Sequence, residues 1–267
     1  MTRRTAGQPD DLWVTTPQGR LLARRWPGID AGAAPLVLLH DSLGCIALWR
    51  DFPALLARQT GRSVIAYDRL GFGQSDRRTG RLSPQFIEEE ACEFFPRLRE
   101  QLGLERFALF GHSVGGGMAV HCAALHADGC EALITESAQA FVEDRTRSGI
   151  LQAQAAFQDP QERERLRRYH ADKADWVLDA WIGTWLSPQF ASWSLDAVLP
   201  LVRCRTLVLH GSDDEYGSRV HPEAIAAGVA GPARLELLAD TRHVPHREHP
   251  AQVAQLAADF LAAAPAS

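Results

Sequence analysis

The feature that most constrains the fold of this chain is an apolar run at residues 107–110, followed directly by Gly-His-Ser-Val-Gly at residues 111–115. The next segment, which extends to residue 125, has the small and apolar composition of a buried helix. A strand that turns sharply into a helix around one serine holds that residue in a strained conformation at the end of a sheet. The flanking glycines are required because any side chain would collide where strand and helix cross. The pattern therefore predicts an exposed, reactive serine at position 113.

Apolar segments of strand length alternate with helix-like segments along most of the chain. The candidate strands are residues 36–40, 64–67, 107–110, 132–135, 206–210 and 234–238. Because continuous apolar strands separated by helices are typical of a parallel sheet covered on both faces, we predict a mostly parallel, doubly wound α/β sheet. Residues 12–15 and 21–25 flank a turn and predict an initial hairpin.

The alternation stops between residues 138 and 200, in a polar, arginine-rich segment with helical patterns. This segment holds the tryptophans Trp176, Trp181, Trp185 and Trp193. We predict that residues 138–200 form a helical lid, inserted after the sixth strand, and that residues 1–137 and 201–267 form the core. Extra helices packed on the core are the alternative. The tryptophans either line an apolar pocket that accepts aryl groups or pack the lid helices together.

Composition and charge exclude several classes of function. The chain has 267 residues, of which 46% are hydrophobic, so it can bury a sizeable core. Its 28 Lys and Arg against 33 Asp and Glu give a net charge of -5, which argues against nucleic-acid binding. We expect no signal peptide, because residues 1–10 carry charge without an apolar segment, and no membrane contact, because no apolar run approaches a membrane span. Five scattered cysteines without C-x-x-C spacing favour reduced thiols and a cytoplasmic location.

A reactive serine needs a base, and the base needs an acid that orients it. Two late loops supply candidates at the C-terminal edge of the predicted sheet, where open α/β sheets place their ligands. The first contains Asp213, Asp214 and Glu215, and Glu136 at the end of an earlier strand is a further candidate acid. The second contains His243, which is favoured as the base because it follows the final strand.

Two more histidines, His246 and His249, lie beyond Pro245 toward the last helix, and we expect both to be structural. The spacing of these histidines and His243 matches no zinc-site pattern, and no cysteine pair accompanies them. We therefore expect no metal, and catalysis by a serine with its base and acid requires no organic cofactor.

Three motifs together make the chain resemble the α/β-hydrolase fold family, from about residue 12 to residue 261. Residues 67–76 are similar to the family's Asp-Arg-x-Gly-x-Gly-x-Ser loop, and residues 211–214 resemble its Gly-x-x-Asp loop. His243, followed by Glu248 and Pro250, resembles the family's histidine loop. The resemblance implies an α/β-hydrolase fold with Ser113, Asp214 and His243 as the catalytic residues.

The resemblance also implies an oxyanion hole formed by two backbone N–H groups. One belongs to Val114, directly after the serine, and the other to Ser42, in the loop after the strand at residues 36–40. This chain has Asp41 where the family usually carries glycine. Since a carboxylate would oppose a developing oxyanion, we predict that Asp41 turns away and caps N–H groups of its own loop.

Serine at the turn, rather than the aspartate of related epoxide hydrolases and dehalogenases, favours an acyl-enzyme mechanism. We predict a serine hydrolase of small or aryl carboxylic esters, with an ester or related carbonyl compound as its partner, in a monomer or homodimer. A carbon–carbon hydrolase of ring-cleavage products, a cofactor-free perhydrolase or haloperoxidase-like enzyme, and a non-catalytic receptor remain alternatives. Against the carbon–carbon hydrolase, Val244 and Pro245 follow His243 where such enzymes often carry tryptophan.

Overall fold

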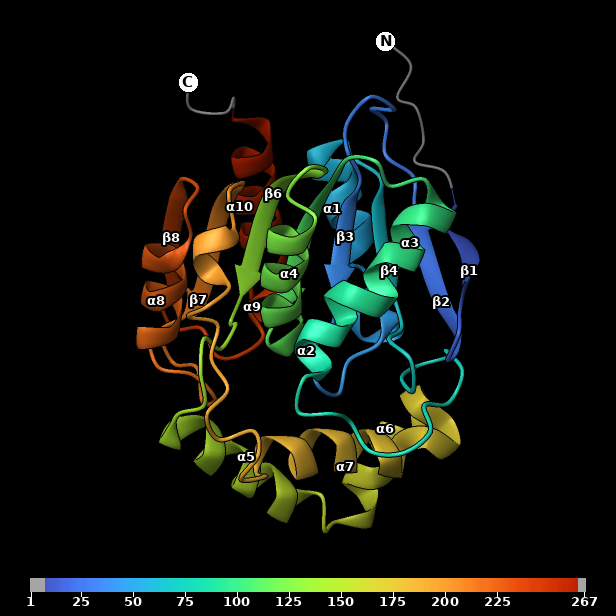
Figure 1. Ribbon diagram of the computed structural model, residues 1–267, viewed down its shortest axis with the longest axis vertical. Coiled ribbons are helices and arrows are strands. Elements are labelled where there is room, and N and C mark those ends of the chain that lie inside the picture. The colour runs from blue at the N-terminus through green and yellow to red at the C-terminus, as the bar shows by residue number, and fades with distance from the viewer. Residues whose placement is uncertain (1–7, 264–267) are drawn as a thin grey trace.

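An eight-stranded sheet forms the centre of the protein (Figure 1). The computed structural model describes residues 8–263, so residues 1–7, most of the segment in which we expect no signal peptide, lie outside the described residues. The strand order is β1-β2-β4-β3-β5-β6-β7-β8. The strands are β1 (Asp10–Thr16), β2 (Gly19–Trp26), β3 (Leu36–Leu39), β4 (Val64–Tyr67), β5 (Phe107–His112), β6 (Cys130–Glu136), β7 (Arg205–Gly211) and β8 (Ala233–Leu238).

The pairing of the strands confirms the mostly parallel sheet and the initial hairpin. β1 pairs antiparallel with β2, and β2 pairs antiparallel with β4. All five remaining pairs, from β4–β3 to β7–β8, are parallel. The central strands β3, β4 and β5 are buried along their whole length, which is why their sequences are continuously apolar rather than alternating.

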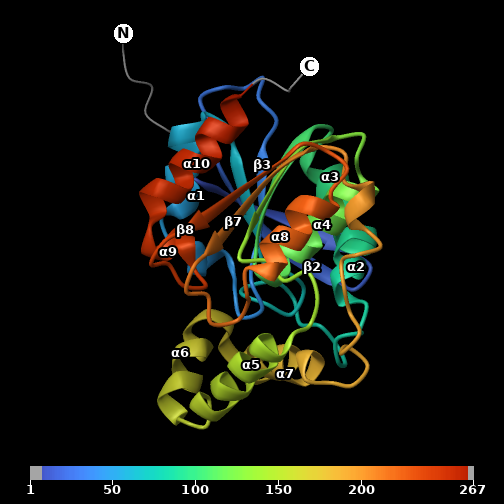
Figure 2. The same cartoon turned by 90° about the vertical axis from the view of Figure 1, so that its left-hand side faces the viewer.

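Helices cover both faces of this sheet (Figure 2). One face packs against α1 (Phe52–Thr60) and α10 (Pro250–Ala262), through side chains such as Leu56 and Val253. The helices on the other face are α2 (Phe86–Glu89), the π-helical turn η2 (Glu90–Phe94), α3 (Phe95–Leu102), α4 (Val114–Leu125) and α8 (Val220–Gly228). Two short 3-10 helices, η1 (Ile46–Trp49) and η4 (Leu199–Leu201), and the short helix α9 (Pro245–Glu248) complete the core. Each face thus has its own apolar layer.

A separate helical layer lies beyond the C-terminal ends of the parallel strands (Figures 1 and 2). Its elements, all between β6 and β7, are α5 (Asp144–Ala156), α6 (Pro160–His170), the 3-10 turn η3 (Ala171–Lys173) and α7 (Ala174–Trp185). We call residues 144–185 the helical layer. None of the helices within residues 8–263 combines the length and the apolar character needed to cross a bilayer.

Candidate active site

Ser113 lies at the turn between β5 and α4, with φ 55° and ψ -125°. This is the left-handed region that non-glycine residues rarely adopt, so the predicted strain is confirmed. A side chain on Gly115 would place its Cβ 2.2 Å from the carbonyl oxygen of Leu39, and one on Gly111 would lie 2.2 Å from the carbonyl oxygen of Gly115. Both glycines are therefore required by the close crossing of strand and helix.

The structure brings the three predicted catalytic residues together from separate strand ends. Nε2 of His243 lies 3.0 Å from Oγ of Ser113, and Nδ1 of the same ring lies 2.9 and 2.8 Å from the two carboxylate oxygens of Asp214. Asp214 is 1% exposed, whereas Ser113 and His243 are 7% and 9% exposed. The acid is thus enclosed, while the serine and the base retain access to solvent.

The carboxylate of Asp214 is held ionised by its surroundings. It accepts hydrogen bonds from the backbone N–H groups of Tyr216, at 2.7 Å, and Gly217, at 3.0 Å. Burial by itself raises the pKa of Asp214, but the imidazoles of His243 and His210 and the N–H of Tyr216 together lower the pKa to about 2. A carboxylate in this state fixes the proton of His243 on Nδ1, which leaves Nε2 free to accept a proton from Ser113.

The other candidate acids have different partners. Glu215 accepts a hydrogen bond from the backbone N–H of His243, at 3.1 Å, rather than from its ring. Glu136 bonds Nδ1 of His246 at 2.5 Å, and Asp213 is exposed. Of the four acids considered from the sequence, Asp214 is the one whose carboxylate contacts the His243 ring.

The two predicted oxyanion donors come from the start of α4 and from the loop after β3. Val114 is the first residue of α4, where backbone N–H groups have no partner within the helix. Ser42 belongs to the loop after β3 and lines the same cavity as Ser113. Within residues 8–263, neither N–H donates a hydrogen bond to another protein group. Their role in stabilising an oxyanion stays a prediction.

Asp41 caps its own loop, as predicted, but it also lines the cavity that contains Ser113, so the expectation that it turns away is wrong. Its Oδ1 accepts the backbone N–H of Leu43 at 2.8 Å, and its Oδ2 lies 3.3 Å from Nδ1 of His112. Its backbone carbonyl is held by His40 and Arg69, each at 2.8 Å. The loop that carries Ser42 is therefore fixed from both its backbone and its side chain.

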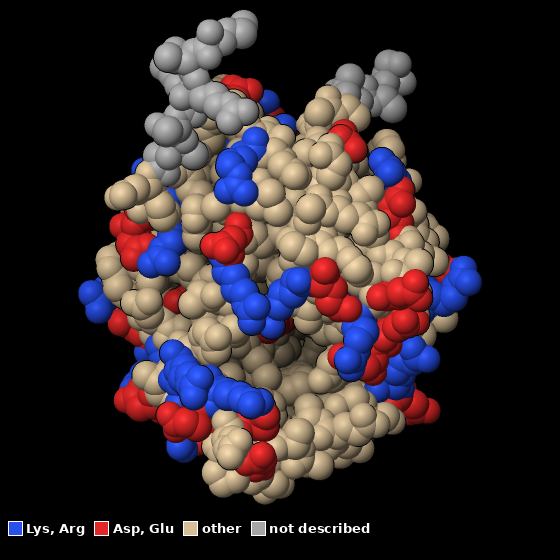
Figure 3. Space-filling view, turned by 180° about the vertical axis from the view of Figure 1, so that it is seen from behind, with Lys and Arg blue, Asp and Glu red and all other residues tan. Residues whose placement is uncertain are grey.

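A cavity of about 390 Å³ opens above Ser113, which is the size of a small-molecule site. The molecular surface is hollowed between the sheet-containing body and the helical layer, with charged side chains at the rim (Figure 3). The strand ends and their loops supply one wall, including the serine and the histidine. The helical layer supplies the other wall, with Ile150, Phe157, Leu166, Trp181 and Trp185.

The four tryptophans of the segment 138–200 divide between the two interpretations. Trp181 and Trp185 line the cavity. Trp193 stacks on Phe190, with ring centroids 5.3 Å apart, and Trp176 packs edge-on against Phe72 at 5.6 Å. Trp185 does both, because its ring also packs edge-on against Phe190 and Trp193, at 5.1 and 5.7 Å. Trp181 and Trp185 therefore contribute to the cavity, and Trp185, Trp176 and Trp193 pack the structure together.

Comparison with known proteins identifies the family. A sequence profile described as the alpha/beta hydrolase fold matches residues 34–175, more than half of the chain. The chain belongs to the alpha/beta hydrolase fold family.

Individual members of the alpha/beta hydrolase family resemble this chain over different lengths. The 2-hydroxymuconate semialdehyde hydrolase of Pseudomonas sp. (strain CF600) is 27% identical over 265 residues, covering 89% of this chain and 90% of that protein. The 1-acylglycerol-3-phosphate O-acyltransferase ABHD5 of Homo sapiens is 40% identical over 86 residues, 32% of this chain, and the match spans only 24% of its own length. The structure of proline iminopeptidase from Mycobacterium smegmatis superimposes with a TM-score of 0.70 at 22% identity, covering 94% of this chain and 97% of that one.

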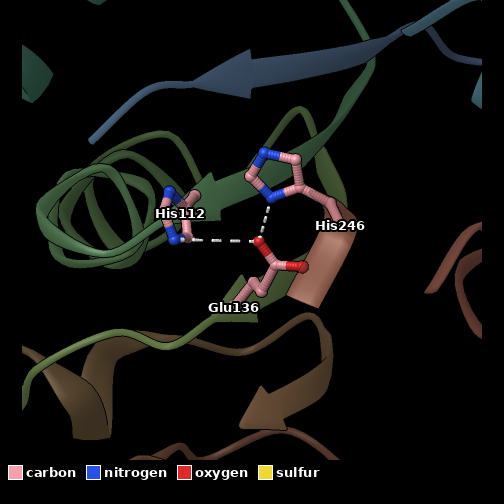
Figure 4. Close-up of side chains that lie close together, drawn as sticks. All are labelled: His112, Glu136 and His246. Carbon is pink, nitrogen blue, oxygen red and sulfur yellow. Dashed lines mark hydrogen bonds and ion pairs between the residues drawn. The ribbon is translucent and has the colours of Figure 1, made fainter. Parts of the chain in front are cut away.

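Beneath the site, this alpha/beta hydrolase has a buried polar cluster that the sequence did not reveal (Figure 4). Nε2 of His112 donates to the backbone carbonyl of His243 at 2.9 Å and lies 4.0 Å from Glu136, which bonds His246. Burial lowers the pKa of His112, but the Asp41 carboxylate and Glu136 outweigh burial and raise the pKa above its ordinary value. The cluster thus links the residue before the serine to the backbone of His243 and to the Asp41 loop.

The ligand atoms of His112, Glu136 and His246 lie within 4.8 Å of one another, a spacing that a metal ion could bridge. However, Nε2 of His112 carries a proton, since it faces a carbonyl oxygen, and Nδ1 of His246 is bonded to Glu136. The rings of Trp49 and Phe52 pack on His246 at 4.7 and 5.2 Å and enclose it in an apolar layer. We therefore interpret the cluster as a hydrogen-bond network, and no sequence spacing signals it because its members come from β5, β6 and α9.

Proposed function

We propose that this alpha/beta hydrolase cleaves carboxylic esters of small or aryl substrates through an acyl-enzyme on Ser113. The observation that carries the proposal is the continuous hydrogen-bond chain from Asp214 through His243 to Ser113, which ends in an accessible cavity. The base lies within hydrogen-bond reach of both the nucleophile and the orienting acid.

In the first half of the reaction, His243 takes the proton of Ser113 as Oγ attacks the ester carbonyl. The resulting oxyanion accepts hydrogen bonds from the N–H groups of Ser42 and Val114, each worth a few kcal/mol in reactions of this kind. Collapse of the intermediate breaks the bond to the alkoxide, which receives the proton from His243 and departs as the alcohol. The product of this half is an ester of Ser113.

In the second half, His243 removes a proton from water, which attacks the acyl carbonyl through the same oxyanion geometry. The acid is released when Oγ of Ser113 departs and regains its proton from His243. Asp214 stays ionised throughout, because a carboxylate with a low pKa does not take the proton of the imidazolium that forms in each half.

The cavity supports small or aryl substrates. Its helical wall presents aliphatic and indole side chains, and aromatic rings favour flat apolar groups through offset and edge contacts. We further propose that the helical layer acts as a lid that defines which substrates enter. The charged groups of the two walls together are the carboxylates of Asp41, Glu162 and Glu215 and the guanidinium groups of Arg165 and Arg247. Because the carboxylates and guanidinium groups are nearly equal in number, the cavity favours uncharged substrates.

A second candidate is hydrolysis of a carbon–carbon bond in a vinylogous diketo acid. The 27% identity to 2-hydroxymuconate semialdehyde hydrolase, over nine-tenths of both chains, favours it. The same serine and histidine would serve, but the substrate carboxylate would have to bind among the three wall carboxylates, with Arg165 or Arg247 as its partner.

The test is active-site titration with a fluorophosphonate probe, on the wild type and on Ser113→Ala, together with nitrophenyl esters of increasing chain length. We expect labelling and ester turnover in the wild type, and neither in Ser113→Ala. Turnover of a vinylogous diketo acid without ester turnover would select the second candidate. A folded wild-type protein that neither labels nor turns over any of these substrates would overturn both and favour a receptor.

A further inference from the structure

Cys130 and Cys204 lie 74 positions apart in the sequence, but the fold brings their side chains into contact. The thiol of Cys130 donates a hydrogen bond to Sγ of Cys204, with the two sulfur atoms 3.7 Å apart. Within residues 8–263, the other cysteines, Cys45, Cys92 and Cys122, form no sulfur–sulfur hydrogen bond. The proposed hydrolytic mechanism uses neither member of the pair.

The pair lies where two neighbouring strands begin, at the edge of the sheet opposite the catalytic serine. Cys130 is the first residue of β6, and Cys204 directly precedes β7. These two strands are parallel, and their pairing starts at Ala132 and Arg205. Cys130 belongs to the apolar layer that also contains Phe107, and Cys204 packs against that layer. The two sulfur atoms therefore meet on one face of the sheet.

Hydrogen bonds hold the backbone near each cysteine. The N–H of Cys130 donates to the carbonyl of His126 at 3.1 Å. Close to Cys204, the carbonyl of Val202 accepts from the N–H groups of residues 230 and 231, at 2.9 and 3.0 Å. From their present separation, the two sulfur atoms need to approach by only about 1.7 Å to form a disulfide bond.

The two thiols differ in exposure and in acidity. Cys130 is 7% exposed, whereas Cys204 is half-buried. The hydrogen bond from Cys130 and the Arg205 guanidinium lower the pKa of Cys204, although burial raises it. The thiolate is the form of cysteine that attacks oxidants. Cys204 is therefore suited to react first, and Cys130, which is in contact with it, to react second.

We propose that Cys130 and Cys204 are a peroxide-responsive pair that forms a reversible disulfide bond between β6 and β7. In the first step, the Cys204 thiolate attacks one oxygen of hydrogen peroxide, the O–O bond breaks, and hydroxide leaves as Cys204 becomes a sulfenic acid. In the second step, the Cys130 sulfur attacks Sγ of Cys204, and the hydroxyl group departs with the thiol proton as water. Two thiols are thereby oxidised, and one hydrogen peroxide is reduced to two water molecules.

The bond joins the two ends of the segment that carries the helical layer. Residues 131–203, which lie between the two cysteines, include most of β6 and the whole helical layer. A cross-link that closes a long loop stabilises the folded state, chiefly by restricting the unfolded chain. We therefore expect the oxidised protein to unfold at a thermal midpoint roughly 5–10 °C above that of the reduced protein. This inference is independent of the proposed function, because its test uses no substrate.

The experiment treats the folded wild-type chain with hydrogen peroxide, blocks the remaining thiols, and digests it with a protease that cleaves before aspartate. This cleavage leaves Cys130 as the one cysteine of residues 128–143 and Cys204 as the one cysteine of residues 196–212. Cys92 and Cys122 fall together in residues 76–127. We expect mass spectrometry to find the first two peptides joined with the loss of two hydrogen atoms, and dithiothreitol to separate them.

Single substitutions test the order of the two steps. In Cys130→Ser, the sulfenic acid on Cys204 has no thiol to react with, so we expect dimedone to label residues 196–212. In Cys204→Ser, we expect no dimedone on residues 128–143 and no rise of the thermal midpoint with peroxide, because the buried Cys130 stays a thiol. The matched control is Cys92→Ser, the same substitution at an exposed cysteine, which should form the cross-link as the wild type does.

Three results would overturn the inference. The first is the absence of the joined peptides in a folded, peroxide-treated wild type, and this result decides the question even where a variant does not fold. The second is equal dimedone labelling of Cys130 and Cys204 in the two single variants, which would contradict the assigned order. The third is a cross-linked wild type whose thermal midpoint does not exceed that of the reduced protein, which would contradict the stabilising role of the bond.

Discussion

The two walls of the cavity are built by different means. On the wall made by the strand ends, backbone geometry and hydrogen bonds position each functional group: a positive φ at Ser113, two N–H groups on Asp214, and a carbonyl contact beneath His243. The helical wall meets the cavity with apolar side chains such as Ile150, Trp181 and Trp185. One wall is therefore suited to fixed chemistry, and the other to selecting shape.

The difference follows from how the two parts are packed. The strand ends lie in the buried sheet, where displacement of one residue disturbs its neighbours on two strands. The outer face of the helical layer is held by exposed pairs such as Arg163 and Arg167 with Asp175, which contribute little to stability. Substitutions should therefore change the rate on the first wall and the preference for substrates on the second.

The largest effect is expected on the strand-end wall, from Asp214→Asn. The amide can no longer hold the proton of His243 on Nδ1, so we expect kcat for a nitrophenyl ester to fall about 10⁴-fold with the fold intact. The matched control is Asp213→Asn, because that neighbouring side chain is exposed and lies outside the hydrogen-bond chain. Similar losses in both variants would contradict the assignment of the acid.

The same substitution should change stability toward acid. The folded-state pKa of Asp214, about 2, lies below its ordinary value of 3.8, so its contribution is fully present above pH 4 and is lost as the pH falls through 2. We expect the free energy of unfolding to fall by on the order of 2 kcal/mol more in the wild type than in Asp214→Asn across this window. Urea unfolding measured from pH 5 to pH 2 tests this, and parallel curves would show that the carboxylate is not stabilised in the fold.

A smaller and qualitatively different effect is expected on the helical wall, from Trp181→Ala. Loss of the indole widens the cavity, so we expect kcat/KM for short acyl esters to fall about tenfold and the preferred chain length to increase. Trp176→Ala, on the same helix but outside the cavity, should leave the preference unchanged. A uniform drop in kcat with no change in preference would mean that this wall takes part in the chemistry.

The smallest effect is expected from Arg165→Ala. Arg165 is exposed and already paired with Glu162, so its removal should change kcat/KM for uncharged esters by less than about twofold. The comparison substrate is a vinylogous diketo acid, measured with the same variant. A loss of kcat/KM confined to this anionic substrate would show that the helical wall recognises charge as well as shape.

Much of the strand-end wall could be predicted from residues close together in the sequence. The turn at Ser113 depends on glycines within two residues, and its strained φ and the required glycines agree with the structure. The capping of the Leu43 N–H by Asp41 is equally local. Such features can be predicted from the sequence because short-range steric contacts and hydrogen bonds determine them.

The sequence by itself thus determined a mostly parallel α/β sheet, a serine at a strand-to-helix turn, and a late histidine on the same edge. Only the tertiary structure decided that Glu136 pairs with His246 and that His112 supports the backbone of His243. It also decided which tryptophans face the cavity. The physical reason is that these contacts join residues tens to more than a hundred positions apart, and long-range packing, which no local pattern encodes, selects each partner.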